Sequence, residues 1–198
     1  MSSVMWPPLR LGAGADELVI RVAIAEDVPV LERWDRDPDV IASTSDDPHA
    51  KQAFEGAIWP DEIAGNSATT CYYIAELAGR PIAAMQVIDP HLEPTRYWGE
   101  IDANLRAIDI WIGERGDRNR GHGARMMRAV IDRCFADLAV TAILIDPLNS
   151  NKDAHRFYQR LGFAVVGRRF FEKDDCLVHR LTREDWAKQQ QTSGDPQA

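Results

Sequence analysis

The sequence predicts an α/β (α+β) protein with a mixed central β-sheet of about six to seven strands flanked by helices. Strand-like apolar runs alternate with amphipathic helical segments in the second half of the chain, which is typical of a partly parallel sheet. Two further strand-like runs flank a short turn containing glycine, as in an antiparallel hairpin. The 198 residues, of which 45% are hydrophobic, suffice for one domain with a substantial core.

Three segments divide the chain. Residues 1–17 lack a periodic apolar pattern and are predicted to form a flexible N-terminal arm. Residues 18–187 contain all the predicted helices and strands, and they are expected to form a single domain. Residues 188–198 are rich in Gln, Ser and Pro and are predicted to be a disordered tail.

The elements of the first part of the domain begin with a β-branched run, Leu18–Ile24, which predicts a strand. A short helix is expected over Glu26–Arg36, because Pro29 falls in its first turn, where a missing N–H costs little. From Asp35 to Glu62 no clear period is present, apart from a predicted helix around Ala50–Ile58. This stretch holds eight acidic and two basic residues.

The middle of the chain predicts the hairpin and a central strand. Cys71–Ala78 and Pro81–Ile88 read as its two strands, joined at Gly79-Arg80. A polar loop over residues 89–106 follows. Ala107–Ile112 then alternates, with Ile108, Ile110 and Ile112 on one face and Asp109 and Trp111 on the other.

The last part predicts two helices and three strands. Gly121–Asp137 has one apolar stripe and forms the clearest helix, and Asn151–Leu161 forms a second that ends at Gly162. The continuous apolar run Ala142–Ile145 suits the buried middle of a sheet. Two more strands are expected over residues 163–171 and 176–181.

Composition excludes several classes of protein. The net charge of −8 disfavours a nucleic-acid binder and suits a cationic partner such as a small amine. Cys71, Cys134 and Cys176 lie far apart and show no metal-ligand spacing, so we expect core thiols and no metal. No apolar run reaches the roughly 20 residues that span a bilayer, and no secretory leader is evident. A cytoplasmic protein that does not bind membranes is therefore expected.

The sharpest local signal is Arg118-Asn119-Arg120-Gly121-His122-Gly123, which follows a strand and opens a helix. Glycines allow close approach of the backbone, and the free N–H groups of a helix start attract anions. The basic residues add positive charge in an otherwise acidic chain. The pattern fits a phosphate site, or equally a solvated loop capped by glycines. It is neither a Walker motif nor a dinucleotide fingerprint.

A family resemblance rests on this loop and on a second block downstream. Arg-x-x-Gly-x-Gly between strand and helix resembles the acetyl-CoA motif of the GCN5-related N-acetyltransferases (the GNAT superfamily). Asn151, Ala154, Tyr158, Gly162 and Phe163 resemble the second half-motif of that superfamily. The blocks 107–110, 134–137 and 146–151 are similar to those of aminoglycoside 6′-N-acetyltransferases, and also to acyltransferases of siderophore synthesis. The first 70 residues add little to the resemblance.

The resemblance implies a GNAT fold with acetyl-CoA as co-substrate. The loop amides would hold the pyrophosphate, and the central strand would pair with the pantetheine arm, with Gly113 expected to help that strand diverge. The residues implied are Ile110, Trp111, Ile112, Arg118, Asn119, Arg120, Gly121, His122, Gly123, Ala124, Asn151, Ala154 and Tyr158.

Direct acetyl transfer to an amine needs a base and an acid. Asp109 is the first candidate base, because it interrupts an apolar strand on the face away from the isoleucines. Asp146 is the second, because it ends a predicted parallel strand, where α/β proteins bind ligands. Tyr158 is the candidate acid that would protonate the leaving thiolate. The alternatives are a solvent-facing Asp109, an Asp146-Pro147 turn and a core aromatic at Tyr158.

Acceptor recognition is assigned to the loop before the central strand. Tyr97, Trp98, Glu100 and Asp102 combine flat rings with carboxylates, which suit an aminosugar, and Asp109 and Asp146 would add to this set. The acidic stretch Asp35–Asp47 is expected to be a solvated loop, with a negative rim as the alternative.

Together these residues predict an acetyl-CoA-dependent N-acetyltransferase that modifies a primary amine of a small polycation, with 6′-N-acetylation of an aminoglycoside as the leading hypothesis. One alternative is a siderophore-type lysine or hydroxylysine N-acyltransferase. Another is a non-catalytic acyl-CoA-binding module, and a protein N-terminal acetyltransferase also fits. A monomer or a homodimer is expected.

Overall fold

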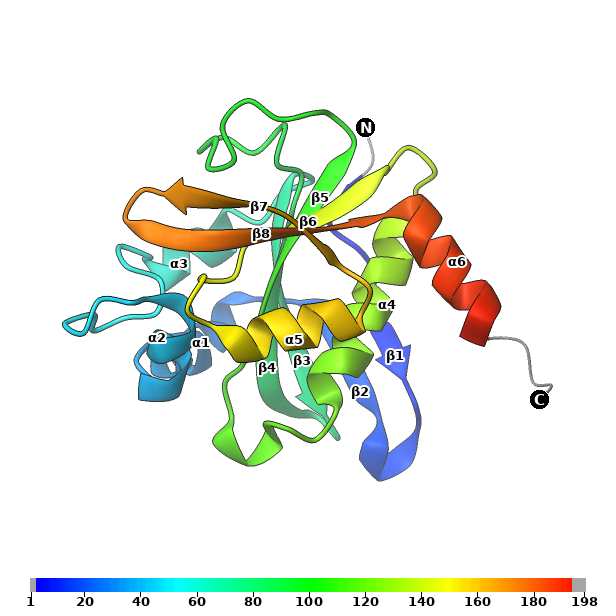
Figure 1. The fold of residues 1–198 in the computed structure, drawn as a ribbon. Coiled ribbons are helices and arrows are strands. Elements are labelled where there is room, and N and C mark those ends of the chain that lie inside the picture. The colour runs from blue at the N-terminus through cyan, green and yellow to red at the C-terminus, as the bar shows by residue number, and fades with distance from the viewer. Residues whose placement is uncertain (1–2, 194–198) are drawn as a thin grey trace.

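The computed structural model describes residues 3–193, which contain one eight-stranded mixed sheet in the order β1-β2-β3-β4-β5-β6-β8-β7 (Figure 1). The predicted mixed sheet is confirmed, with one more strand than expected. The strands are β1 (Leu9–Leu11), β2 (Leu18–Val22), β3 (Thr70–Leu77), β4 (Arg80–Ile88), β5 (Leu105–Ile112), β6 (Ala142–Ile145), β7 (Ala164–Phe171) and β8 (Asp174–Thr182).

The sheet is antiparallel except at one junction. Among the described strands, only β5 and β6 run parallel, and their pairing is short, from Leu105↔Ala142 to Ala107↔Leu144. β5 continues to Ile112, whereas β6 ends at Ile145. The next segment follows β8 instead, because the Leu177 N–H donates to the Pro147 carbonyl. The two parallel strands therefore diverge and leave one edge of β5 open from Ile108 onward.

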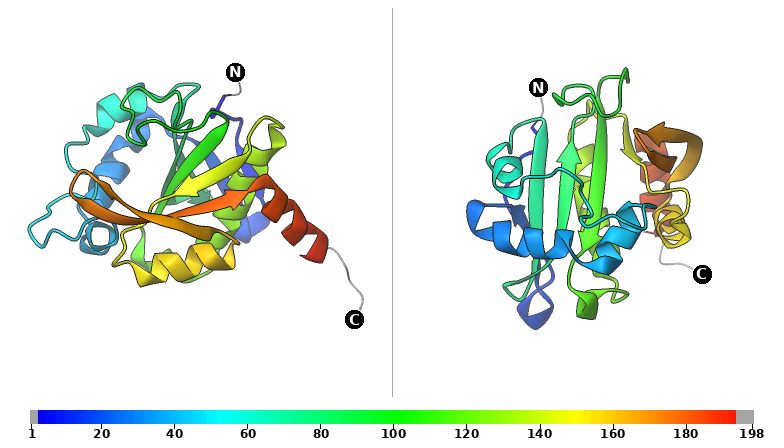
Figure 2. Two further views of the ribbon diagram at one scale, coloured as in Figure 1. Left: turned by 45° about the horizontal axis from the view of Figure 1, so that its top comes forward. Right: turned by 90° about the vertical axis from the view of Figure 1, so that its left-hand side faces the viewer.

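The helices form layers on both sides of the sheet (Figure 2). α1, α2 and α3 pack on one face through a cluster centred on Trp34, Trp59 and Trp111. α4 and α5 pack on the opposite face. The helices are α1 (Val28–Asp35), α2 (Pro38–Thr44), α3 (Trp59–Ala64), α4 (His122–Ala136), α5 (Lys152–Arg160) and α6 (Arg183–Ser193), with 3-10 turns at Gly14–Asp16, Ala25–Asp27 and Arg115–Asp117.

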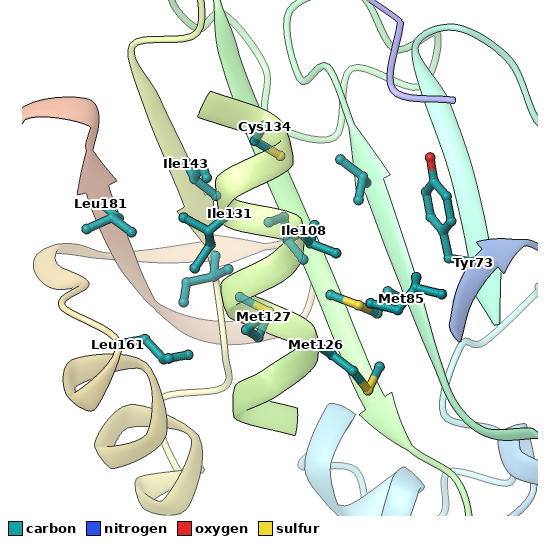
Figure 3. Close-up of a cluster of buried hydrophobic side chains, with 14 of the residues drawn as sticks. Tyr73, Met85, Ile108, Met126, Met127, Ile131, Cys134, Ile143, Leu161 and Leu181 are labelled. Atoms are coloured by element: carbon teal, nitrogen blue, oxygen red, sulfur yellow. The ribbon is translucent and has the colours of Figure 1, made fainter. Parts of the chain in front are cut away.

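The main core lies between α4 and the sheet (Figure 3). The apolar stripe of α4 places Met127 and Ile131 against Ile108 of β5 and Ile143 of β6. Ile110 and Ile112 pack on the same cluster, whereas Trp111 belongs to the cluster on the opposite face. The predicted alternation of β5 is therefore confirmed, and it turns Asp109 away from the main core.

Within residues 3–193, both terminal segments contain regular structure that the sequence did not predict. The arm contains β1, and its side chains Val4 and Trp6 are buried in the main core, where Trp6 stacks on Tyr73 with ring centroids 5.5 Å apart. The tail was predicted to be disordered from Lys188, but α6 continues to Ser193. Buried Trp186 donates to Asp132 of α4 at 2.9 Å and fixes α6. The rest of the tail, 194–198, lies outside the described residues.

Two local predictions in the first half were wrong. Residues 50–58 form turns instead of a helix, because the Asp35 carboxylate accepts hydrogen bonds from the Phe54 N–H and from Gln52, both at 2.9 Å. The hairpin turn lies at Ala78-Gly79 instead of Gly79-Arg80. Both of its residues have positive φ, 50° and 78°, as in the type I′ turns that suit the twist of a hairpin.

Candidate active site

A cleft of about 780 Å³ opens where β5 and β6 diverge. Its floor is formed by side chains of β3, β4 and β5 that face α1–α3. Its walls come from the loop before β5, the turn between β6 and α5, and the turn between β7 and β8. Segments that are distant in the sequence therefore surround the end of the open strand edge.

Asp109 lies on the cleft floor, as its place in β5 predicts. Its carboxylate reaches the cleft, and among the described residues no group donates a hydrogen bond to it. The side chain stays exposed to the solvent of the cleft, but the surrounding walls limit its hydration. This desolvation, followed by the charge of Asp146, raises the pKa of Asp109 to about 7.

Asp146 follows β6 and lines the same cleft. The Tyr97 hydroxyl donates to its Oδ2 at 2.7 Å. Burial raises the pKa of Asp146, although the bond from Tyr97 and the charge of Arg169 act in the opposite direction. The Asp146-Pro147 turn is also present, so the turn and the place in the cleft occur together.

Tyr158 extends from α5 into the cleft and is buried. Its ring is part of the main core, and its hydroxyl makes no hydrogen bond to the described residues. Burial and then the charges of Asp109 and Asp146 raise its pKa, so the hydroxyl stays protonated. The position therefore combines the core and cleft roles that the sequence left open.

Two uncharged polar residues missed by the sequence analysis share the floor with Asp109. Tyr72 on β3 faces Gln86 on β4, which faces Asp109 on β5 in the strand register. These three side chains form a polar row across an otherwise apolar sheet face. The Tyr72 hydroxyl donates to Glu62 of α3 at 3.0 Å. Only the strand register reveals this row, because its members are 14 and more residues apart in the sequence.

The cleft is strongly acidic. The lining includes eight carboxylates and one basic side chain, Lys173, which is already paired with Glu55. The acidic members are Glu55, Asp61, Glu62, Glu93, Asp109, Asp146, Glu172 and Asp174. A compact cation would gain attraction from several of these groups at once, because the walls reduce the screening by water.

The predicted acceptor residues are only partly brought together. Tyr97 lines the cleft and stacks on Phe171 with centroids 4.5 Å apart. Trp98 is buried behind it and supports the aromatic wall. Glu100 and Asp102 are exposed and lie outside the cleft, because the loop turns away after Trp98. The prediction that these two carboxylates bind the acceptor is not supported by their positions.

The loop before α4 fits an anion. Asn119 and Gly121 have positive φ, 60° and 82°, which turns successive N–H groups toward one side. The first intrahelical bond is donated by Arg125 to the Gly121 carbonyl, so the N–H groups of His122, Gly123 and Ala124 precede it. Arg120 is exposed and forms no ion pair within the described part of the chain. This arrangement suits a phosphate group.

Arg118 has a different role from the one predicted for it. Its guanidinium donates to Asp37 at 3.0 Å, to Asp39 at 2.5 Å and to the carbonyls of Ile112 and Gly113. Its charge is therefore neutralised by α2, and its side chain fixes the loop. The same contacts show that this part of the Asp35–Asp47 stretch is structural instead of a solvated loop.

Asn151 and Ala154 lie near the open edge, as predicted, whereas Gly113 has a different role from the one expected. The Asn151 side chain caps α5 by accepting from the Ala154 N–H at 3.0 Å, and both residues line the cleft. Gly113 does not cause the strand divergence. A Cβ there would lie 2.1 Å from Trp34, so glycine permits close packing of α1.

A family model described as an acetyltransferase (GNAT) domain matches residues 23–171. The chain belongs to this GNAT acetyltransferase family. The matched range includes the open edge of β5, the loop before α4 and all of α5. The likeness inferred from the two sequence blocks is thus confirmed at the level of the family.

Similar GNAT proteins include aminoglycoside acetyltransferases. An aminoglycoside N(6′)-acetyltransferase type 1 from Klebsiella pneumoniae is 34% identical over 109 residues, 54% of this chain and 53% of that protein. A kanamycin resistance protein from Rhizobium radiobacter is 37% identical over 77 residues, 38% of this chain and 71% of that protein. The crystal structure of aminoglycoside acetyltransferase AAC(6′)-Ib with coenzyme A has a TM-score of 0.73 and 25% identity, and the match covers 87% of this chain and 99% of that one.

The match to the first of these relatives therefore spans about half of its length. Among residues 3–193, no group of three or more His, Cys, Asp or Glu side chains is placed to hold a metal ion. No helix in that range is long and apolar enough to cross a bilayer.

Proposed function

We propose that this GNAT domain transfers the acetyl group of acetyl-CoA to a primary amine of a small polycation, with the 6′-amine of an aminoglycoside as the leading acceptor. The observation that supports it most is the carboxylate of Asp109, which accepts no hydrogen bond from the described residues. It lies in an acidic cleft beside the open edge of β5. The names of the similar proteins point to the same acceptor class.

The donor would lie along the divergence of β5 and β6. The N–H groups at the start of α4 and the Arg120 guanidinium would hold its phosphates. The edge of β5 that β6 leaves unpaired, from Ile108 to Trp111, would hydrogen-bond its pantetheine amides. When bound, acetyl-CoA supplies an activated thioester carbonyl. The residues present fit this group.

The acceptor amine arrives as an ammonium and must lose a proton before it can attack. The raised pKa of Asp109 makes it a better proton acceptor than an ordinary aspartate. Asp109 would take that proton directly or through a water molecule, while Asp146, held by Tyr97, would bind a second ammonium. The new N–C bond then forms as the C–S bond breaks.

Tyr158 would give its hydroxyl proton to the departing thiolate. The negative charges of Asp109 and Asp146 contribute to its raised pKa. A bound polycation neutralises those charges, so acceptor binding would lower the pKa of Tyr158 toward that of the thiol. The acidic cleft would thus couple acceptor binding to proton donation.

The lysine-type alternative is disfavoured by the cleft lining. An amino-acid acceptor carries a carboxylate, which needs a cationic partner. Lys173 is the sole basic residue among the lining side chains, and Glu55 already pairs with it. A cleft with eight carboxylates favours an acceptor with no anionic group.

Free-thiol release from acetyl-CoA tests the proposal. The panel holds a kanamycin-type aminoglycoside, an otherwise identical compound with a hydroxyl in place of the 6′-amine, a polyamine, lysine, hydroxylysine and a short peptide. We expect turnover with the 6′-amine and none with the 6′-hydroxyl compound. Turnover with lysine or peptide alone would overturn the acceptor class. Coenzyme A binding without turnover on any amine would favour the binding module.

A further inference from the structure

A second pocket of about 330 Å³ lies behind the aromatic wall of the cleft, between β7–β8 and the loop before β5. Trp98 lines both hollows. The floor of the second pocket is apolar and is formed by Leu105, Leu144 and Val178, which are all buried. Its volume is near the lower end of the range of pockets that bind small organic molecules.

The rim of this pocket is basic. Three arginines line it, Arg168, Arg169 and Arg180, together with one acidic residue, Asp102. Arg168 is neutralised, because it donates twice to Asp175, at 2.6 and 2.5 Å. The other two arginines carry charges that no ion pair in residues 3–193 neutralises.

These two arginines lack acceptors. The Nε atom of Arg180 is buried without a hydrogen-bond partner, an arrangement that normally costs free energy unless an acceptor is supplied. The Arg169 guanidinium lies over the Phe171 ring at 4.6 Å and donates no hydrogen bond to a described residue. Even with Asp102 counted, the pocket has an excess of positive charge in a chain of net charge −8.

We propose that this second pocket binds a small organic anion, a carboxylate or a phosphate ester with a compact apolar body, with its charged group between Arg169 and Arg180. The apolar body lies on Leu144 and Val178 and against the rear face of Trp98. A guanidinium and an anion form charge-assisted hydrogen bonds, which are stronger than those between neutral groups. The polycation of the acidic cleft cannot occupy this site, because the rim repels it.

Calorimetric titration with four single-ring probes tests the site. Benzoate and phenyl phosphate carry the required charge, benzamide is neutral, and benzylamine is cationic. With the loop before α4 saturated by coenzyme A, we expect each anion to bind this pocket at one equivalent and benzamide to bind at least tenfold more weakly than benzoate. Benzylamine is expected to leave the Trp98 indole resonance unchanged, because any binding of this cation would be in the acidic cleft. The tighter of the two anions identifies the preferred charged group. An indole N–H resonance that shifts with benzoate and is missing in Trp98→Phe would locate the probe.

Matched variants separate this site from a general charge effect. Arg180→Gln and Arg169→Gln should each weaken benzoate binding at least tenfold. Arg168→Gln removes an equal charge from the rim, but its guanidinium is already paired, so we expect less than a threefold change. Thermal unfolding without probe checks that each variant is folded. Equal losses in all three variants, equal binding of benzoate and benzamide, or no binding of either anion would overturn the proposal, independently of any acetyl transfer.

Discussion

Asp109 and Asp146 share one cleft, but the chain holds them differently. Tyr97 donates to Asp146 at 2.7 Å, whereas no described group donates to Asp109. A carboxylate without a donor gains most from a substrate ammonium, since its desolvation is otherwise uncompensated. Of the two, Asp109 is therefore the better placed to bind the reacting amine and accept its proton.

We expect Asp109→Asn to lower kcat on the order of 100-fold or more, because an amide cannot accept the proton. The affinity for coenzyme A should stay within a factor of about two to three, since the loop before α4 is unchanged. Glu100→Gln is the matched control, because Glu100 is exposed outside the cleft. Steady-state thiol release and coenzyme A titration measure both quantities. Similar losses in the two variants would refute the role of Asp109.

Tyr158→Phe should lower kcat at least tenfold with little change in KM, because the ring still packs in the core and only the proton donor is lost. Burial raises the pKa of Tyr158, so its hydroxyl remains protonated throughout the usual assay range. Tyr73→Phe removes the same atom from a remote tyrosine bonded to Val4 and should affect stability alone. A wild-type rate for Tyr158→Phe at every pH would exclude the acid role.

At the scale of elements, the divergence of β5 and β6 and the loop before α4 form one unit. Arg118 joins them, because it binds the carbonyls that end β5 and the two aspartates of α2. The end of α2 lines the cleft, so Arg118 connects a wall of the cleft to the proposed phosphate site. Binding on one side is expected to be sensitive to the position of the other.

Arg118→Gln should reduce the free energy of unfolding by about 1–3 kcal/mol, because two carbonyls and two carboxylates lose a charged donor. It should also raise the KM for acetyl-CoA, since the loop loses its fixed position. Arg115→Gln is the control, because that side chain is 86% exposed and makes one contact, at 3.7 Å; its effect should stay within about 0.5 kcal/mol. Chemical denaturation and donor titration give both values, and equal effects would contradict the anchoring role.

The residues of the candidate site that could be predicted are those placed by local sequence patterns. Alternation in β5 placed Asp109 correctly, and the glycine loop and the Asn151 cap followed from local patterns. Arg118 was assigned to phosphate because its partners, Asp37 and Asp39, are about 80 residues away in sequence. Tyr72 and Gln86 were missed because only the strand register places them beside Asp109. The irregular 50–58 segment depends on the buried Asp35 carboxylate, a tertiary contact that overrides local propensity.

At the scale of the whole molecule, negative and positive side chains line two different cavities that lie next to each other, the acidic cleft and the second pocket. The larger one is lined by eight carboxylates, and the smaller one by three arginines. Trp98, Tyr97 and Phe171 form the wall between them. Desolvation in the cleft, followed by the charges of neighbouring carboxylates, raises the pKa of Asp109 and of Asp146, so the proposed function has a cost in stability.

This cost should appear as a pH-dependent gain in stability for Asp109→Asn. The folded pKa of Asp109 is raised from 3.8 to about 7, so the folded chain holds that proton more tightly than the unfolded chain. The stabilising contribution is present below the unfolded pKa and is lost as pH rises through the folded pKa. We expect equal Tm values near pH 4 and a higher Tm for the variant at pH 8. A constant difference between the two proteins across this range would contradict the expectation.

The early end of β6 has a consequence for solubility and selectivity. An unpaired strand edge on the outside of a sheet can recruit a strand from another protein and start aggregation. Here the unpaired edge of β5 lies in the interior of the sheet, with β6 diverging on one side and β4 paired on the other. Because strands flank this edge on both sides, the edge of another sheet is hindered from pairing with it, whereas a single extended chain is hindered less. The fold thus keeps main-chain hydrogen-bonding capacity available for a slender ligand and protects it from other proteins.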